Sequence, residues 1–171
     1  MIISLKSSLQ AHTVLVVDDE ADSLLVCRML LEMYGATVIT AINGNEALAK
    51  IKSTSFDLII SDLSMPKMDG WQLLEHIRQD DDLKEIPVIA LTAHAMSGDR
   101  TKALNAGFDN YMTKPLIPET FRKELAKIIA ETPSIVKRRN TQAEERYDKT
   151  PKSQSHASNY SDSIGNKEPN A

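Results

Sequence analysis

The chain has 171 residues, of which 42% are hydrophobic, so it is long enough for one domain of ordinary size and a short extension. Its formal net charge of −4 argues against direct nucleic-acid binding, and its single cysteine, Cys27, excludes an internal disulfide. No apolar run approaches the roughly 18 residues of a membrane-spanning helix, so we expect a cytoplasmic protein without membrane insertion.

Five short apolar runs in the first two thirds of the chain have the composition of strands. Four of them are rich in β-branched or aliphatic residues, as parallel strands buried on both faces require. The fifth is more polar. The runs are Val14–Val17, Thr37–Thr40, Leu58–Ile60, Pro87–Leu91 and Phe108–Met112.

Five segments with helical periodicity follow these runs in alternation. The first ends before Gly35, a residue that often follows the last turn of a helix, and the last opens with Pro118 at a favourable first position. The segments are 20–34, 45–52, 71–79, 97–106 and 118–130. This alternation predicts an α/β fold of the (βα)5 type, a doubly wound parallel five-stranded sheet with helices on both faces.

Composition also divides the chain along its length. We expect residues 1–12 to be a short N-terminal extension and residues 13–131 to form the folded domain. Residues 132–171 are rich in Ser, Asn, Lys and Gln and have no apolar periodicity beyond Ile135 and Val136, which predicts a disordered polar tail. Such a tail is too short for an independent output domain. His12 is interpreted as a surface residue.

Polar residues follow or end four of the predicted strands. Asp18 and Asp19 come directly after the first, Asp62 follows the third, Thr92 ends the fourth and Lys114 follows the fifth. The carboxyl ends of parallel strands meet at one edge of the sheet, where ligands of such folds bind. We therefore expect these residues to share one crevice.

The residue types in that crevice indicate phosphoryl chemistry. Clustered carboxylates repel one another unless a cation compensates them, and Mg²⁺ prefers oxygen ligands of this kind. A lysine and a hydroxyl beside the metal would bind the remaining oxygens of a phosphoryl group moving onto a carboxylate. Each residue alone has a structural explanation, such as a helix cap at Asp18 or a turn at Asp62, but those explanations leave the constellation unexplained.

Four motifs resemble the receiver domain of bacterial two-component response regulators, in particular the stand-alone chemotaxis-regulator type. The resemblance runs from about Thr13 to Ala130, and it implies a flavodoxin-like strand order of 2-1-3-4-5. The motifs are Leu15–Glu20 (LVVDDE), Ser61–Gly70 (SDLSMPKMDG), Leu91–Ala93 (LTA) and Thr113–Pro115 (TKP).

The resemblance implies roles for the acidic residues. Asp62 would be the phosphoacceptor. Asp19 would bind Mg²⁺ directly and Asp18 largely through water, with Asp62 and the backbone carbonyl of Ser64 as further metal ligands. The phosphoryl group would come from a sensor histidine kinase or a histidine phosphotransfer protein. The chain would then act as a phosphorylation-dependent switch with intrinsic hydrolysis, and not as an enzyme that turns over an external substrate.

The resemblance also implies a switch mechanism. Lys114 would contact the phosphoryl group, Thr92 would hydrogen-bond it and shift toward it, and Tyr111 would turn inward behind Thr92. The Lys114–Pro115 bond is often cis in this family. The surface formed by residues 94–130 would change as a result and control a downstream protein partner, or the phosphoryl group would pass onward.

Several alternatives stay open at this point. Tyr111 is equally interpretable as a half-buried aromatic residue without a switching role. A phosphorylation-independent pseudo-receiver would lack some of the acidic or lysine residues, all of which are present. A phosphatase with an aspartate nucleophile would need a second aspartate at position 64, which is Ser64. A flavodoxin-like cofactor binder would need a phosphate-binding loop after the first strand, where the acidic Asp18–Glu20 stands instead.

Overall fold

The computed structural model describes residues 9–93 and 98–138, which include a single five-stranded parallel sheet. The strand order is β2-β1-β3-β4-β5, so the predicted fold class and the implied order 2-1-3-4-5 are confirmed. The strands begin and end within two residues of the predicted runs. They are β1 (Thr13–Val17), β2 (Thr37–Ala41), β3 (Leu58–Asp62), β4 (Val88–Thr92) and β5 (Asn110–Thr113).

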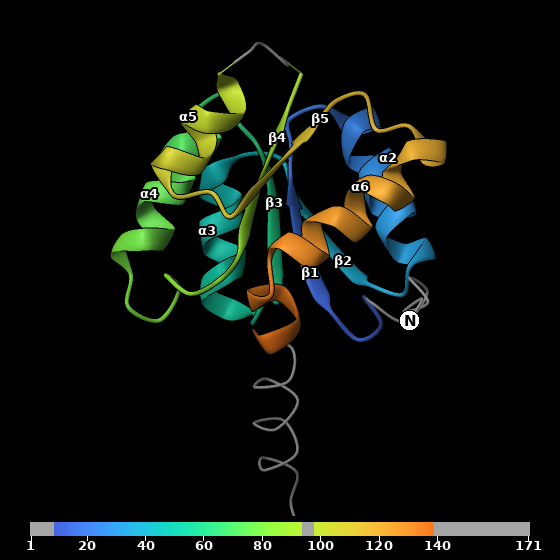
Figure 1. Ribbon diagram of the computed structural model, residues 1–171. Coiled ribbons are helices and arrows are strands. Elements are labelled where there is room, and N and C mark those ends of the chain that lie inside the picture. Colours follow the sequence, from blue (N-terminus) through green and yellow to red (C-terminus); the bar gives the residue numbers. More distant parts are fainter. Residues whose placement is uncertain (1–8, 94–97, 139–171) are drawn as a thin grey trace, which may run out of the picture.

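Helices cover both faces of this sheet (Figure 1). Helices α2 and α6 pack on one face, and α3, α4 and α5 pack on the other. This division follows from the right-handed crossovers that join parallel strands. The helices are α2 (Ala21–Met33), α3 (Gly44–Ser53), α4 (Gly70–Gln79), α5 (Asp99–Ala106) and α6 (Pro118–Glu131).

Local sequence signals explain where several helices begin and end. The Asn43 side chain accepts a hydrogen bond from the backbone N–H of Glu46 and caps α3. At the start of α4, Asp69 and Gln72 satisfy each other's backbone N–H groups in a capping box. Gly107 ends α5 with a φ of 107°, a left-handed conformation that glycine adopts without strain.

The central strands contribute to two separate hydrophobic cores. Along β1, Val14 and Val16 pack in the cluster under α2 and α6, whereas Leu15 and Val17 pack in the cluster under α3 and α4. All four side chains are fully buried. Burial on both faces explains why this strand is a continuous apolar run without alternation, and it fixes the position of the residue that follows, Asp18.

The packed region extends beyond the predicted domain of residues 13–131 at both ends. Leu9 and His12 are fully buried, so the surface interpretation of His12 is wrong. Residues 134–138 are helical, Ile135 is fully buried, and the Arg138 Nε donates a hydrogen bond to the Phe56 backbone carbonyl at 2.7 Å. The tail prediction is therefore wrong for residues 132–138, because one buried isoleucine produces no periodicity. Residues 1–8 and 139–171 lie outside the described residues.

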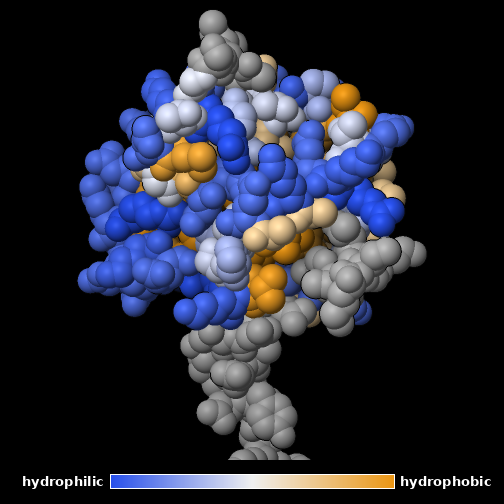
Figure 2. Space-filling view, in the orientation of Figure 1, coloured by the Kyte–Doolittle hydropathy of each residue, from blue (hydrophilic) through white to orange (hydrophobic). Residues whose placement is uncertain are grey.

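Most of the surface is polar, and α2 is the main exception. Figure 2 shows hydrophobic residues as small separate patches on one largely hydrophilic face. On α2, by contrast, Leu25, Met29 and Met33 are each more than half exposed and recur at every fourth residue. Across residues 9–93 and 98–138, we find no helix long and apolar enough to cross a lipid bilayer.

The packing of residues 134–138 predicts a stability difference between two neighbouring residues. Ile135→Ala should lower the free energy of unfolding by about 2–5 kcal/mol, because it leaves a cavity in a core position. Val136→Ala is the matched control, since Val136 is 39% exposed, and it should change that free energy by less than about 0.5 kcal/mol. Urea unfolding followed by circular dichroism measures both. Equal effects would show that residues 134–138 do not belong to the folded domain.

Candidate functional site

The parallel strands bring four predicted site residues to one edge of the sheet. Asp62 ends β3 and Thr92 ends β4, while Asp18 and Lys114 directly follow β1 and β5. Each of these strands pairs in parallel with its neighbour, so their carboxyl ends lie level with one another. Residues separated by up to 96 positions in the sequence, from Asp18 to Lys114, therefore meet at one place.

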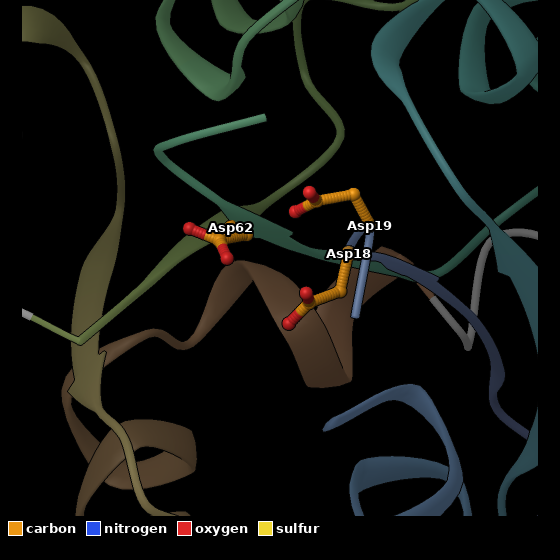
Figure 3. A group of neighbouring side chains, drawn as sticks. All are labelled: Asp18, Asp19 and Asp62. Atoms are coloured by element: carbon orange, nitrogen blue, oxygen red, sulfur yellow. The ribbon is translucent and has the colours of Figure 1, made fainter. Parts of the chain in front are cut away.

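Three carboxylates form the centre of this site (Figure 3). Asp18, Asp19 and Asp62 each place one oxygen within 4.8 Å of the others, and their side chains point into a common space. Asp18 is fully buried, Asp62 is 6% exposed, and Asp19 lies at the solvent-facing side of the group. Two of the three negative charges are thus held away from water, which is unfavourable unless a positive charge compensates them.

Lys114 supplies a positive charge beside the two buried carboxylates. Its Nζ lies 2.7 Å from Asp18 Oδ2 and 2.6 Å from Asp62 Oδ2, and its side chain is 10% exposed. The Lys114 backbone N–H donates to the Thr92 carbonyl at 2.7 Å, and the Lys114–Pro115 bond is cis, as the family resemblance implies. Burial alone would lower the pKa of Lys114, but the hydrogen bonds and charges of the two aspartates raise that pKa above its ordinary value.

The loop after Asp62 fixes the orientation of its carboxyl group. Asp62 Oδ1 accepts a hydrogen bond from the Ser64 backbone N–H at 2.9 Å. Further along, a Cβ at Gly70 would overlap the Asp62 backbone carbonyl, so this close return of the chain requires glycine. Burial raises the pKa of Asp62, and the hydrogen bonds from Lys114 and Ser64 offset only part of that increase.

Two residues that the sequence reasoning did not assign to the site contact it directly. The Ser23 hydroxyl donates to Asp18 Oδ2 at 2.6 Å, and the Glu20 backbone N–H donates to Asp18 Oδ1 at 3.0 Å. The Glu20 carboxylate also lies 3.3 Å from Lys114 Nζ. The sequence signal that could have identified Ser23 is its position in the first turn of the helix that follows the aspartate pair.

Thr92 and Tyr111 lie on the same face of the sheet. Tyr111 pairs in register with Ala90, and Thr92 is two residues beyond Ala90 along β4, so the three side chains share one side. Thr92 is buried, whereas Tyr111 is half-buried and packs in the cluster under α3, α4 and α5. Burial, followed by the charge of Asp99, raises the pKa of Tyr111.

Residues 94–97, which belong to the predicted switch surface, lie outside the described residues.

The acidic group fits a divalent cation. Ligand oxygens of an octahedral Mg²⁺ lie about 3 Å apart when adjacent and about 4.2 Å apart when opposite. The three carboxylates, with oxygens within 4.8 Å of one another, can therefore surround one cation after moving inward or with water between them. Three carboxylates and one ammonium leave a formal charge of −2, which a divalent cation would neutralise. The donors are all hard oxygen atoms, as Mg²⁺ and Mn²⁺ prefer.

A parallel sheet in the order 2-1-3-4-5, with an acidic cluster and a lysine at its carboxyl edge, defines a receiver-type α/β domain. The family model for the response regulator receiver domain matches residues 14–126. The chain therefore belongs to the response regulator receiver domain family, which serves two-component signalling. The resemblance to this family that the four sequence motifs indicated is confirmed.

Relatives and solved structures agree with this assignment. The chain is 41% identical over 125 residues to the sensor histidine kinase GacS of Pseudomonas protegens. The matched region covers 71% of this chain but only 13% of the kinase. The structure resembles the chemotaxis response regulator CheY4 of Vibrio cholerae, with a TM-score of 0.63 and 33% identity over 68% of this chain and 98% of that chain. It also resembles the Mn²⁺-bound response regulator Rcp1, with a TM-score of 0.58 and 26% identity over 70% and 92% of the two chains.

Proposed function

We propose that Asp62 is the phosphoacceptor of a phosphorylation-dependent signalling switch. The observation that carries this proposal is the position of its carboxylate, 2.6 Å from Lys114 Nζ and within the acidic group formed with Asp18 and Asp19. Asp62 keeps 6% of its surface exposed, so an incoming group can reach it while bulk water is largely excluded. The alternative of a phosphorylation-independent pseudo-receiver is not favoured, because none of these groups is missing.

The transfer step follows from this geometry. A carboxylate oxygen of Asp62 attacks the phosphorus atom of a phosphohistidine, a P–O bond forms and the P–N bond breaks. The leaving imidazole keeps the electron pair of that bond and takes a proton from water. The ammonium of Lys114 stabilises the negative charge on the phosphoryl oxygens. Water later hydrolyses the acyl phosphate and restores the Asp62 carboxylate, so the protein is a switch and not an enzyme with an external substrate.

We assign the metal site to Mg²⁺, with Asp18, Asp19, Asp62 and the Ser64 carbonyl as its protein ligands. The oxygen-rich donor set supports this assignment, and the Mn²⁺-bound form of Rcp1 supports divalent binding in a similar fold. When bound, the cation supplies positive charge for the phosphoryl oxygens. Asp19 is suited to direct coordination because its side chain is exposed, whereas Asp18 is already engaged by Ser23 and Lys114.

The signal would leave the site through Thr92 and Tyr111. Thr92 moves toward the phosphoryl group, and Tyr111 follows on the same face of the sheet. Because Tyr111 belongs to β5, which contacts both α5 and α6, its movement shifts the population of states of the α5–β5–α6 surface. That surface would then bind a downstream protein partner differently, or the phosphoryl group would pass to another histidine.

The exposed apolar residues of α2 support a docking face for the histidine donor. Leu25, Met29 and Met33 are 56%, 55% and 68% exposed, and α2 begins three residues after Asp18. A groove of about 400 Å³ between the start of α2 and Lys114 adjoins this face. A sensor kinase or phosphotransfer protein seated there would hold its phosphohistidine next to Asp62.

Asp62→Asn should abolish phosphorylation, because the neutral amide oxygen is a much weaker nucleophile than a carboxylate oxygen. The measurement is incorporation of ³²P from labelled acetyl phosphate in the presence of Mg²⁺, with no incorporation when a chelator is added beforehand. Asp81→Asn is the control, since the Asp81 side chain is 92% exposed and lies away from the site. Equal labelling of Asp62→Asn and wild type would refute the proposal, as would an unlabelled wild type.

Met29→Lys should separate protein docking from chemistry. Transfer from a phosphohistidine domain that labels the wild type should slow by about 5- to 30-fold, the loss expected for a central interface residue. Labelling by acetyl phosphate should be unchanged, because Met29 does not touch the site. Val136→Lys is the control at an exposed apolar residue outside α2. If both donors are affected equally, α2 is not the docking face.

A further inference from the structure

Ser23 contacts the most deeply buried carboxylate of the site. Its hydroxyl donates a hydrogen bond to Asp18 Oδ2 at 2.6 Å, and Asp18 is fully buried. Ser23 lies in the first turn of α2, the helix that begins just after the aspartate pair. The start of α2 is therefore tied to the acidic group through one short hydrogen bond.

The contacts of Asp18 divide its two oxygens into different roles. A carboxylate offers about four lone-pair positions on its two oxygens. Oδ2 faces two donors, the Ser23 hydroxyl and Lys114 Nζ at 2.7 Å, whereas Oδ1 accepts from the Glu20 backbone N–H at 3.0 Å. Oδ2 is thus fully engaged, and within the described residues Oδ1 has that one donor. The oxygen of Asp18 that can serve a cation, or a water bound to a cation, is Oδ1.

The Ser23 hydrogen bond restricts the rotation of this carboxyl group. The Asp18 backbone is already held in the sheet, because its N–H donates to the Ala41 carbonyl at 3.0 Å. The freedom that is left is rotation of the carboxyl group, which is soft in aspartate and would exchange the two oxygens. Lys114 reaches Oδ2 on a flexible four-carbon stem and also contacts Asp62. The short Ser23 side chain is the more rigid of the two donors to Oδ2.

We infer that Ser23 is a positioning residue of the metal site, which holds Asp18 Oδ2 and so leaves Oδ1 for the space shared with Asp19 and Asp62. Ser23 acts through Asp18 and touches neither the cation nor the phosphoryl group. A carboxylate that is oriented in advance need not be ordered when the cation binds, so the affinity for Mg²⁺ rises. The inference rests on the proposed Mg²⁺ site and names a residue that sets its affinity.

An opposing electrostatic effect of the same hydrogen bond is smaller. Donation by Ser23 withdraws some negative charge from the carboxylate, which by itself would weaken the attraction for a cation. The donor is neutral, however, and it binds Oδ2 and not Oδ1. Without the hydroxyl, Oδ2 would lose a partner at a fully buried position, where water cannot replace it. Loss of a group that orients a metal ligand typically weakens metal binding by about 10-fold or more.

Mg²⁺ alone, titrated into the full chain, provides the test. NMR titration measures its dissociation constant for the wild type, Ser23→Ala, Ser23→Thr and Leu24→Ala, and thermal melts without metal measure stability. Ser23→Thr keeps the hydroxyl, and the groove that Ser23 lines has room for the added methyl group. Leu24→Ala is the stability control, since Leu24 is the next residue of α2 and packs in the core under α2 and α6.

Ser23→Ala should bind Mg²⁺ about 10-fold more weakly than the wild type, whereas Ser23→Thr should bind like the wild type. Leu24→Ala should melt at a lower temperature but keep its affinity for Mg²⁺. The inference is overturned if Ser23→Ala binds Mg²⁺ as tightly as the wild type or more tightly. It is also overturned if Ser23→Thr is as weak as Ser23→Ala, or if Leu24→Ala loses as much affinity.

Failure of the proposed function would look different in the same experiment. A wild type that does not bind Mg²⁺ would refute the metal assignment together with this inference. A wild type that binds Mg²⁺ but takes no label from acetyl phosphate would refute the role of Asp62, while the comparison of the Ser23 variants would still decide the inference.

Discussion

The pairing of Lys114 with Asp18 and Asp62 is the interaction on which the site depends. Two carboxylates that are almost completely buried would repel each other and lose their hydration, and the ammonium between them makes their burial possible. Replacing such a group by packed apolar residues would often cost nothing or stabilise a protein. Its presence at the carboxyl edge of the sheet is therefore better explained by chemistry at Asp62 than by stability.

The fold serves this interaction by keeping the strand ends level. β1 and β3 are buried on both faces and lie between two hydrophobic cores, so Asp18 and Asp62 are attached to the buried centre of the sheet. Lys114 reaches them from β5, at the other side of β4. The exposed carboxylates of Asp19 and Glu20 lie at the solvent side of the site, where Asp19 is accessible to a cation.

The strands and the residues at their ends were predictable because each depends on a local pattern. An aliphatic run identifies a buried strand, and the rule for parallel sheets then places Asp18, Asp62 and Lys114 together. Ile135 and His12 were missed because their burial depends on tertiary packing at the far edge of the sheet, where one residue forms no periodic signal. The contact of Glu20 with Lys114 was also missed, because it joins residues 94 positions apart that only the tertiary structure brings together.

The most direct test of this account is the unfolding free energy of Lys114→Met with and without Mg²⁺. Without the metal, the variant should lose about 3 kcal/mol, because two buried carboxylates are left without a cation. Added Mg²⁺ should stabilise the variant more than the wild type, since we propose that the cation binds the same carboxylates in the folded state alone. A variant as stable as the wild type without metal, or one that gains no more from Mg²⁺, would contradict the central role of this pairing.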